Sequence, residues 1–331
     1  MTNQFQLILL GAKGYGKSTP RCELVEQIAD YLCKSLADYQ AENVNKCDQA
    51  DKQKLLIIDG TNLLCQMFFG MPARITGKDG KPIHGILGFV GALIRIIKMT
   101  SPTHLVVLFD GEHENHRTEI YADYKTNRPD YIDVSEEENP FSQLADIYTA
   151  LDFMSIKHAE INDGEADDAI ASYALTYGGN TQIVISSFDS DFFQLVTHNV
   201  SVLRYRGENT IICDDAYIQQ KLGVSARLYA DFKSLTGDNS DNIKGAEKVG
   251  PKTAAALVND FGSLQDILKN ADHIVKPSVR ESVKRNFERL ITNYSLIKLD
   301  NKSALPYCIN DLKYCYDGIS TNEVLQKIGL R

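Results

Sequence analysis

Long hydrophobic runs, paired cysteines and an excess of basic residues are all missing from this sequence of 331 residues. No apolar run approaches the roughly 20 residues of a transmembrane helix, and the short run at 7–10 has no basic segment before it, so we expect neither a membrane protein nor a secretory signal. The seven cysteines are scattered without a CxxC pair. This argues against a disulfide framework or a zinc site and fits a reducing cytoplasm.

Basic residues are outnumbered, with 35 Lys and Arg against 44 Asp and Glu and a formal charge of −9. This balance argues against nucleic acid as a partner, because a phosphate-binding protein usually presents a basic surface. The objection fails if many of the acids gather in one metal site, where bound cations cancel their charge. The positions of the carboxylates therefore decide the question.

The hydrophobic pattern divides the chain into three stretches. Residues 1–53 are expected to form a strand, a Gly-rich turn, a helix and a polar linker. In residues 54–225, β-branched runs at 55–59, 104–110, 182–189 and 200–206 alternate with helical patterns such as 85–99 and 141–151. This alternation predicts an α/β fold with a central, mainly parallel twisted sheet and helices on both faces. Residues 226–331 read mainly as helices, and the polar segment 112–140 is either a functional connection or an ordinary solvated loop.

Three aspartates follow predicted strands: Asp59, Asp110 and Asp189. Ligand sites of open parallel sheets lie beyond the carboxyl ends of the strands, so these side chains are expected to converge. A single aspartate in such a place often caps the next helix, but three together favour a common site.

Further acids accompany these three. Glu165, Asp167 and Asp168 lie where a helix should begin, a position at which the helix dipole alone would explain one or two acids but not a triplet. Asp191 follows Asp189, and Asp238 and Asp241 are three residues apart, which predicts one helical face. The full set is Asp59, Asp110, Glu165, Asp167, Asp168, Asp189, Asp191, Asp238 and Asp241.

Nine carboxylates in one cleft could not all ionise without cations, because neighbouring like charges raise each other's pKa. Oxygen ligands select Mg²⁺ or Mn²⁺, and two such ions about 4 Å apart can activate water and stabilise the leaving oxygen of a phosphodiester. Setting these nine charges aside brings the formal charge of −9 to zero. The sequence therefore favours a metal-dependent nuclease.

Six ordered blocks carry a family resemblance: LLIIDGTNLL, THLVVLFDG, HRTEIYADYKTNRP, GEADDAIASYA, SSFDSDFFQL and LTGDNSDNIKG…VGPKTAAALV. From residue 54 onward the sequence resembles the 5′-nuclease (flap endonuclease) superfamily, and it is most similar to the 5′–3′ exonuclease domain of bacterial DNA polymerase I and its stand-alone relatives. The resemblance implies two metal groups. The first holds Asp59, Asp110, Glu165 and Asp167, and the second holds Asp191, Asp238 and Asp241, with Asp168 and Asp189 nearby or shared.

The resemblance also implies a helical arch near residues 112–140. Asp59, Asp110, Lys125 and Arg128 would be catalytic, the two basic residues holding the scissile phosphate, and Arg117 matches another basic position. Without the resemblance, these three cations would be read as surface charges. Tyr124 would either stack on a base or belong to the core.

Residues 226–261 resemble the family's helix–three-turn–helix, in which backbone amides and K⁺ grip duplex phosphates. Matching DNA-binding positions are Lys233, Gly245, Gly250, Lys252 and Thr253. Lys248 stands where the family commonly has a glycine, and since a lysine adopts a left-handed turn only at a cost, it puts the K⁺ site in doubt while offering a phosphate contact. A basic stretch further on is either a duplex-binding face or a solvated helix; it comprises Lys276, Arg280, Lys284, Arg285 and Arg289.

The segment GAKGYGKS fits the phosphate-binding P-loop pattern, with Gly11, Gly16, Lys17 and Ser18 as its characteristic positions. It offers an alternative, a P-loop NTPase or nucleotide kinase. About 50 residues are too few for an independent nucleotide-binding sheet, so we do not expect ATP as a cofactor. The favoured function is a Mg²⁺- or Mn²⁺-dependent 5′–3′ exonuclease or flap endonuclease. It would be a cytoplasmic monomer without a membrane partner, acting on duplex DNA with a 5′ end or flap, RNA–DNA primer junctions included.

Overall fold

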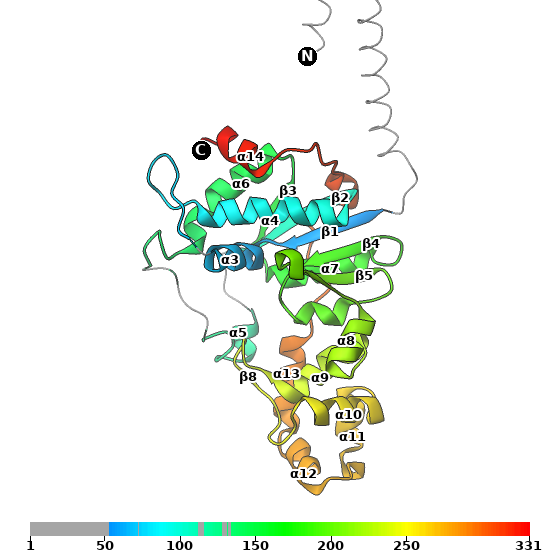
Figure 1. The fold of residues 1–331 in the computed structure, drawn as a ribbon. Coiled ribbons are helices and arrows are strands. Elements are labelled where there is room, and N and C mark those ends of the chain that lie inside the picture. The colour runs from blue at the N-terminus through cyan, green and yellow to red at the C-terminus, as the bar shows by residue number, and fades with distance from the viewer. Residues whose placement is uncertain (1–52, 72, 112–115, 128–130, 132–133) are drawn as a thin grey trace, which may run out of the picture. The chain divides into compact units, whose positions relative to one another are not determined.

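The computed structural model describes residues 53–331, apart from 72, 112–115, 128–130 and 132–133 (Figure 1). Lys52–Arg331 forms one compact unit. Gly11, Gly16, Lys17, Ser18 and Arg128 lie outside the described residues. No helix in the described part of the chain has the length and apolar character needed to cross a membrane.

A six-stranded sheet in the order β3-β2-β1-β4-β5-β6 forms the centre of the unit. Its strands are β1 Lys54–Asp59, β2 His104–Asp110, β3 Lys157–Ile161, β4 Gln182–Ser186, β5 Val200–Arg204 and β6 Ile211–Cys213. All neighbouring strands are parallel except β5 and β6, which pair antiparallel. The strand order reverses between β1 and β4, so a ligand site is expected beside the end of β1.

Helices cover both faces of the sheet because its strand residues alternate in direction. Leu56 and Ile58 pack in the core on one face, which contains α3 Gly60–Gly70, α4 His84–Thr100, α6 Leu144–Phe153 and α14 Thr321–Lys327. Leu55 and Ile57 pack on the other face with α7 Ala166–Tyr177. The predicted α/β class, with a mainly parallel sheet between helices, is therefore confirmed.

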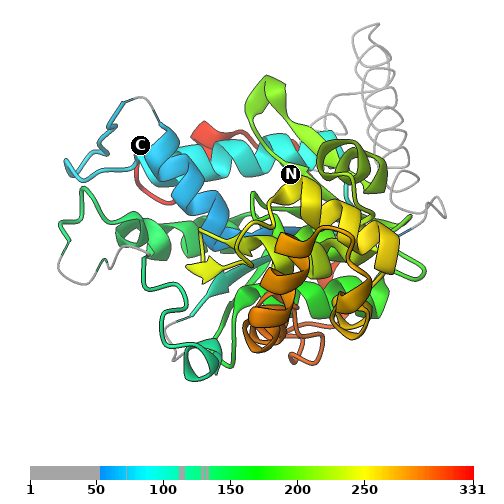
Figure 2. The same ribbon diagram turned by 90° about the horizontal axis from the view of Figure 1, so that it is seen from below.

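The chain beyond β6 is mainly helical, and its helices α9 to α13 are nearest the viewer in Figure 2. The helices are α8 Asp215–Leu222, α9 Tyr229–Thr236, α10 Pro251–Phe261, α11 Leu264–Lys269, α12 Pro277–Arg285 and α13 Phe287–Ile297. The 3₁₀ turns are Pro140–Gln143, Asp191–Leu195, Gly207–Asn209, Ala226–Leu228, Ala271–His273 and Ile309–Leu312. Between α9 and α10 lies a short antiparallel ribbon, β7 Gly237–Asp238 and β8 Ile243–Lys244.

The expected arch is described only in part. A short helix, α5 His116–Ile120, is followed by turns up to residue 127. Tyr124 packs there in a small core with Ile243 of β8 and Leu296 and Ile297 of α13. This core joins the beginning of the expected arch to the helical region.

Candidate active site

The ends of β1 and β2 carry the first two carboxylates. Asp59 caps α3 by accepting from the Asn62 N–H at 3.0 Å, and its second oxygen accepts from the Ser187 hydroxyl at 2.7 Å. Asp110 accepts from the Ala166 N–H at 3.0 Å, which places the end of β2 beside the start of α7. The expectation that strand ends bring acids together therefore holds for Asp59 and Asp110.

Asp189 lies three residues beyond the end of β4 rather than at its end. The chain turns after Ser186, and the Ser187 hydroxyl accepts from the Asp189 N–H at 3.0 Å. Asp189 in turn accepts from the Asp191 N–H at 2.8 Å. The turn thus carries Asp191 of the second predicted group next to Asp189, which was predicted to lie near the two groups or to be shared by them. The sequence SSFDSD contains Ser187, but serine beside aspartate is too common a pattern to have indicated this role.

Burial and neighbouring charges raise the pKa of two acids of this site, Asp59 and Asp167. Burial, with Asp110 as the next contributor, raises the pKa of Asp59 to about 7. Burial also raises the pKa of Asp167 well above its usual range, and the neighbouring charges of Asp189 and Asp59 add to the effect. These mutual effects place Asp59, Asp110, Asp167 and Asp189 in one site.

Glu165 and Asp168 differ from these acids because both are paired with cations. Glu165 forms ion pairs with Arg117 and Lys125. Asp168 accepts from the Arg117 guanidinium at 2.7 Å and from the Asp300 N–H at 2.8 Å. Burial by itself would lower the pKa of Arg117, but Asp168 outweighs it and the pKa is raised. Arg117 is therefore a buried partner of the carboxylates and Lys125 a partly buried one, and neither is the surface charge expected from the residues without the resemblance.

The second group gathers Asp191, Asp238 and Asp241, each with one oxygen within 4.8 Å of the others. Lys233 of α9 is buried among them, paired with Asp191 and lying 2.5 Å from Asp238. Burial raises the pKa of Asp191 to about 7 although Lys233 opposes the shift. Burial would also raise the pKa of Asp238, but Lys233 and the hydrogen bonds from Ser240 hold it below its usual value.

The prediction that Asp238 and Asp241 share a helical face is wrong. Gly237 has a φ of +77° and ends α9, after which Asp238 lies in β7 and Asp241 in the following turn. Asp238 accepts from both the N–H and the hydroxyl of Ser240, which shapes this turn. The turn still brings the two carboxylates together. The two side chains are therefore neighbours as predicted, but the backbone between them is a turn and not a helix.

The expected duplex-binding residues occupy three settings. Gly245 lies against the backbone of α9, where an added Cβ would come within 2.3 Å of the Thr236 carbonyl. Lys248 adopts a φ of +65°, the left-handed conformation that we expected a lysine to avoid. Gly250 is the N-cap of α10, with Lys252 and Thr253 in its first turn.

Three residues expected to contact DNA are buried, and Arg117, already described with its carboxylates, is one of them. Tyr124 is 4% exposed, and its hydroxyl lies 3.5 Å from Glu165. This corresponds to the core alternative and leaves its ring unavailable to a base in this arrangement. Lys233 is 6% exposed and is engaged by carboxylates.

The carboxylate site fits divalent ions by its donor set. The ion pairs that the structure describes bring three cations to the nine acids, namely Arg117, Lys125 and Lys233. Several of the acids are buried with raised pKa values, and all the donor atoms are carboxylate oxygens. Hard divalent cations satisfy such a site by ligating the oxygens and cancelling the excess charge.

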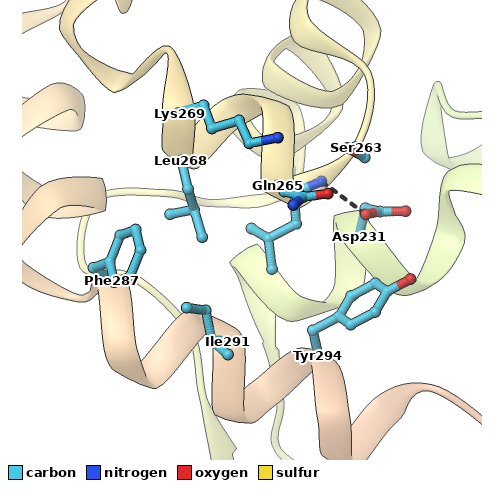
Figure 3. Close-up of a pocket in the computed structure, with 9 residues that line it drawn as sticks. Asp231, Ser263, Gln265, Leu268, Lys269, Phe287, Ile291 and Tyr294 are labelled. Carbon is cyan, nitrogen blue, oxygen red and sulfur yellow. Dashed lines mark hydrogen bonds between the residues drawn. The ribbon is translucent and has the colours of Figure 1, made fainter.

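A hollow of about 520 Å³ lies elsewhere, between α11 and α13 (Figure 3). Leu268, Phe287 and Ile291 face it, and Asp231 at its edge accepts from the Leu264 N–H at 2.7 Å. Among the described residues that line it, none is one of the nine predicted carboxylates. The acid site is therefore separate from this apolar hollow.

Two family models match the chain in succession. The model of the 5′-3′ exonuclease N-terminal resolvase-like domain matches residues 54–223. The model of the 5′-3′ exonuclease C-terminal SAM fold matches residues 224–317. The chain belongs to the 5′-3′ exonuclease family. The resemblance and the expectation of a nuclease are thereby confirmed.

Individual relatives agree with this assignment. The chain is 34% identical over 260 residues to the 5′-3′ exonuclease of Aquifex aeolicus, covering 78% of this chain and 86% of that protein. It is also 34% identical over 271 residues to DNA polymerase I of Streptococcus pneumoniae R6, covering 80% of this chain and 30% of that protein. The chain thus spans about 30% of the length of the DNA polymerase I relatives it matches.

Among solved structures, T5 5′-exonuclease with bound divalent zinc ions is similar, with 25% identity and a TM-score of 0.62, covering 83% of this chain and 97% of that one. Both family models begin at or beyond residue 54, outside the P-loop segment. The alternative of a P-loop NTPase finds no support in these comparisons.

Proposed function

We propose that this chain is a divalent-metal-dependent 5′–3′ exonuclease and flap endonuclease. Its substrate is duplex DNA with a 5′ end or a 5′ flap, and it hydrolyses a phosphodiester bond near that end or junction. The removal of RNA primers and flaps in replication and repair is the context that fits this activity. The observation that carries the proposal is the meeting of two carboxylate groups beside the end of β1, in a chain of this nuclease family.

Mg²⁺ or Mn²⁺ would be held by oxygens of the two groups. Asp59, Asp110, Asp167 and Asp189 suit the first ion, with Glu165 adjoining them. Asp191, Asp238 and Asp241 suit the second. When bound, the ions supply a nucleophilic water near neutral pH and stabilise negative charge on the phosphate.

Lys125 is the side chain best placed to contact the scissile phosphate. Its ammonium pairs with Glu165 and lies 5.0 Å from the centre of the Tyr124 ring, so its position is fixed from two sides. A positioned cation stabilises charge that develops on the phosphate oxygens. Arg117 holds Glu165 and Asp168 in place, and Arg128 remains a proposed second phosphate contact.

Duplex binding is assigned to the helical region. α10 begins at Pro251, and its N-cap Gly250 makes no side-chain hydrogen bond, so the backbone N–H groups of Lys252 and Thr253 in the first turn are available to phosphate. Lys248 adds a cation to this surface, and K⁺ at the loop before α10 stays a prediction. We also propose that residues 54–225 and 226–331 form two domains. We propose further that the protein acts as a monomer.

The test is cleavage of a 5′-labelled flap duplex by the full chain with Mg²⁺, Mn²⁺ or EDTA. Asp189→Asn should abolish release of short 5′ products, because it removes a charge shared by both groups. Asp152→Asn is the matched control, since its carboxylate is exposed on α6 and pairs only with His158 among the contacts described. Absence of metal-dependent cleavage by the folded wild type, or equal activity of Asp189→Asn, would refute the proposal.

A further inference from the structure

A set of hydrogen bonds joins the segment that carries Lys125 to the turn that carries Asp241. The Lys125 N–H donates to the Asp241 carbonyl at 3.2 Å, and the Asn127 side-chain amide donates to the Asn239 carbonyl at 2.9 Å. These segments are more than 110 residues apart in sequence but adjacent in space, where α5 lies beside β8 in Figure 1. We call this contact between residues 123–127 and 239–242 the latch.

Asn242 contributes two of the bonds of the latch. Its side-chain amide nitrogen donates to the Asp123 carbonyl at 3.0 Å and to the Thr126 hydroxyl at 3.2 Å. An amide nitrogen carries two hydrogens, so both are used. Asn242 therefore grips the turn on both sides of Lys125.

The backbone of the latch explains why an asparagine suits this position. Asn242 has a φ of +59°, a left-handed conformation that asparagine tolerates better than most other residues with side chains. Lys125 has a φ of +56°, which a lysine adopts only at a cost. The hydrogen bonds of the latch offset that cost and hold Lys125 in the conformation that directs its ammonium to Glu165.

We infer that Asn242 is a positioning residue for Lys125, and that the latch couples ion binding at Asp191, Asp238 and Asp241 to the placement of Lys125. The inference rests on the proposed function and deepens it. An ion that fixes Asp238 and Asp241 also fixes the carbonyls of Asn239 and Asp241, to which the Lys125 segment is bonded. Coupling of this kind is reciprocal, so a loosened latch weakens ion binding at the second group by the same factor.

Hydrogen exchange measured by mass spectrometry tests the coupling without relying on activity. In the full-length wild type, 10 mM Mg²⁺ should slow exchange in peptides covering 121–127 and 237–244 together, relative to EDTA. Asn242→Gly removes the donor and keeps the left-handed conformation available. In this variant Mg²⁺ should still slow 237–244 but no longer slow 121–127.

Two further variants separate positioning from general loss of structure. Asn127→Ala removes a different bond of the latch at an exposed position and should act in the same direction. Asn259→Ala is the control, because it removes a side-chain amide of α10 that donates to the Gly223 carbonyl at 2.7 Å, away from the latch. This variant should exchange like the wild type. Joint protection of both peptides in Asn242→Gly, or no effect of Mg²⁺ on 121–127 in the wild type, would overturn the inference.

Kinetics supply the second readout. Asn242→Gly should lower the single-turnover cleavage rate about tenfold, about 1.4 kcal/mol at the transition state, while the Kd for the flap duplex stays within about twofold. A rise in Kd with an unchanged rate would contradict a positioning role. If the wild type does not cleave at all, the proposed function fails, and the exchange experiment still decides whether the latch couples the two segments.

Discussion

Replacing Lys233 by methionine tests the electrostatics of the second carboxylate group. Lys233 is 6% exposed, and its ammonium lies between Asp191 and Asp238. Methionine keeps the length and apolar stem of the side chain but removes the charge. In the absence of metal, the variant therefore leaves two buried carboxylates without their cation.

The expected loss of stability follows from this geometry. Removing one partner of a buried ion pair costs about 3–5 kcal/mol, because the remaining charge is uncompensated. A loss of this size lowers the Tm of the compact unit Lys52–Arg331 by roughly 5–9 °C, because the entropy of unfolding grows with chain length. The loss should be larger at pH 8 than at pH 6, since the carboxyls take up protons more readily at the lower pH once the lysine is gone.

Thermal unfolding in EDTA and in 10 mM Mg²⁺ measures both parts of this prediction. Mg²⁺ should stabilise Lys233→Met more than it stabilises the wild type, because the ion replaces the missing positive charge. Lys284→Met is the matched control, since Lys284 pairs with an exposed Asp272 and such surface pairs contribute about 0–1 kcal/mol. Equal Tm losses for the two variants in EDTA, or no additional rescue by Mg²⁺, would refute the reasoning.

Three other predictions follow from the site and the helical region. Because the pKa of Asp59 is raised to about 7 in the folded state, the metal-free protein should lose stability as the pH rises from about 4 to about 7. This group contributes a slope of at most about 1.4 kcal/mol per pH unit, and saturating Mg²⁺ should abolish it. An unchanged slope with Mg²⁺ would contradict this prediction. Gly245→Ala should lower the unfolding free energy by more than about 2 kcal/mol in urea titrations, because the added Cβ would lie 2.3 Å from Thr236. Gly70→Ala is the control and should cause no such loss, since a Cβ there would meet nothing within 4 Å. Similar losses in both variants would be inconsistent with the close approach at Gly245. Lys248→Gly should raise the unfolding free energy by about 0.5–1 kcal/mol by relieving the φ of +65°, and a lower value would show that the lysine side chain stabilises the loop.

The sequence predicted the sheet and its acids well where one local pattern was enough. Asp59 and Asp110 each end a continuous apolar strand, so strand assignment placed both carboxylates at the edge where parallel strands meet. The strands β6, β7 and β8 were missed because two or three residues carry no periodic pattern. The helix expected at Asp238 fails because Gly237 ends α9 with a positive φ.

Partners across the fold could not be predicted from spacing. Lys233 was placed among the DNA-binding residues because the resembling family has a basic residue at this position, whereas the fold buries it against Asp191, 42 residues away. Arg117 similarly pairs with acids about 50 residues further along. No role was predicted for Asn242 because its partners, Asp123 and Thr126, belong to a segment more than 110 residues earlier in the sequence. Contacts of this kind depend on the packing of α9, α13 and β8 around Tyr124.

The central claim, that the nine carboxylates form two sites for divalent ions, is tested most directly by counting bound Mn²⁺. Electron paramagnetic resonance of the full-length protein at pH 7.5 should detect at least two ions per chain in the wild type. Asp59→Asn and Asp191→Asn, one from each group, should each weaken or remove one ion, and Asp152→Asn should remove none. Fewer than two ions per wild-type chain, or binding unchanged in both Asp59→Asn and Asp191→Asn, would contradict the account.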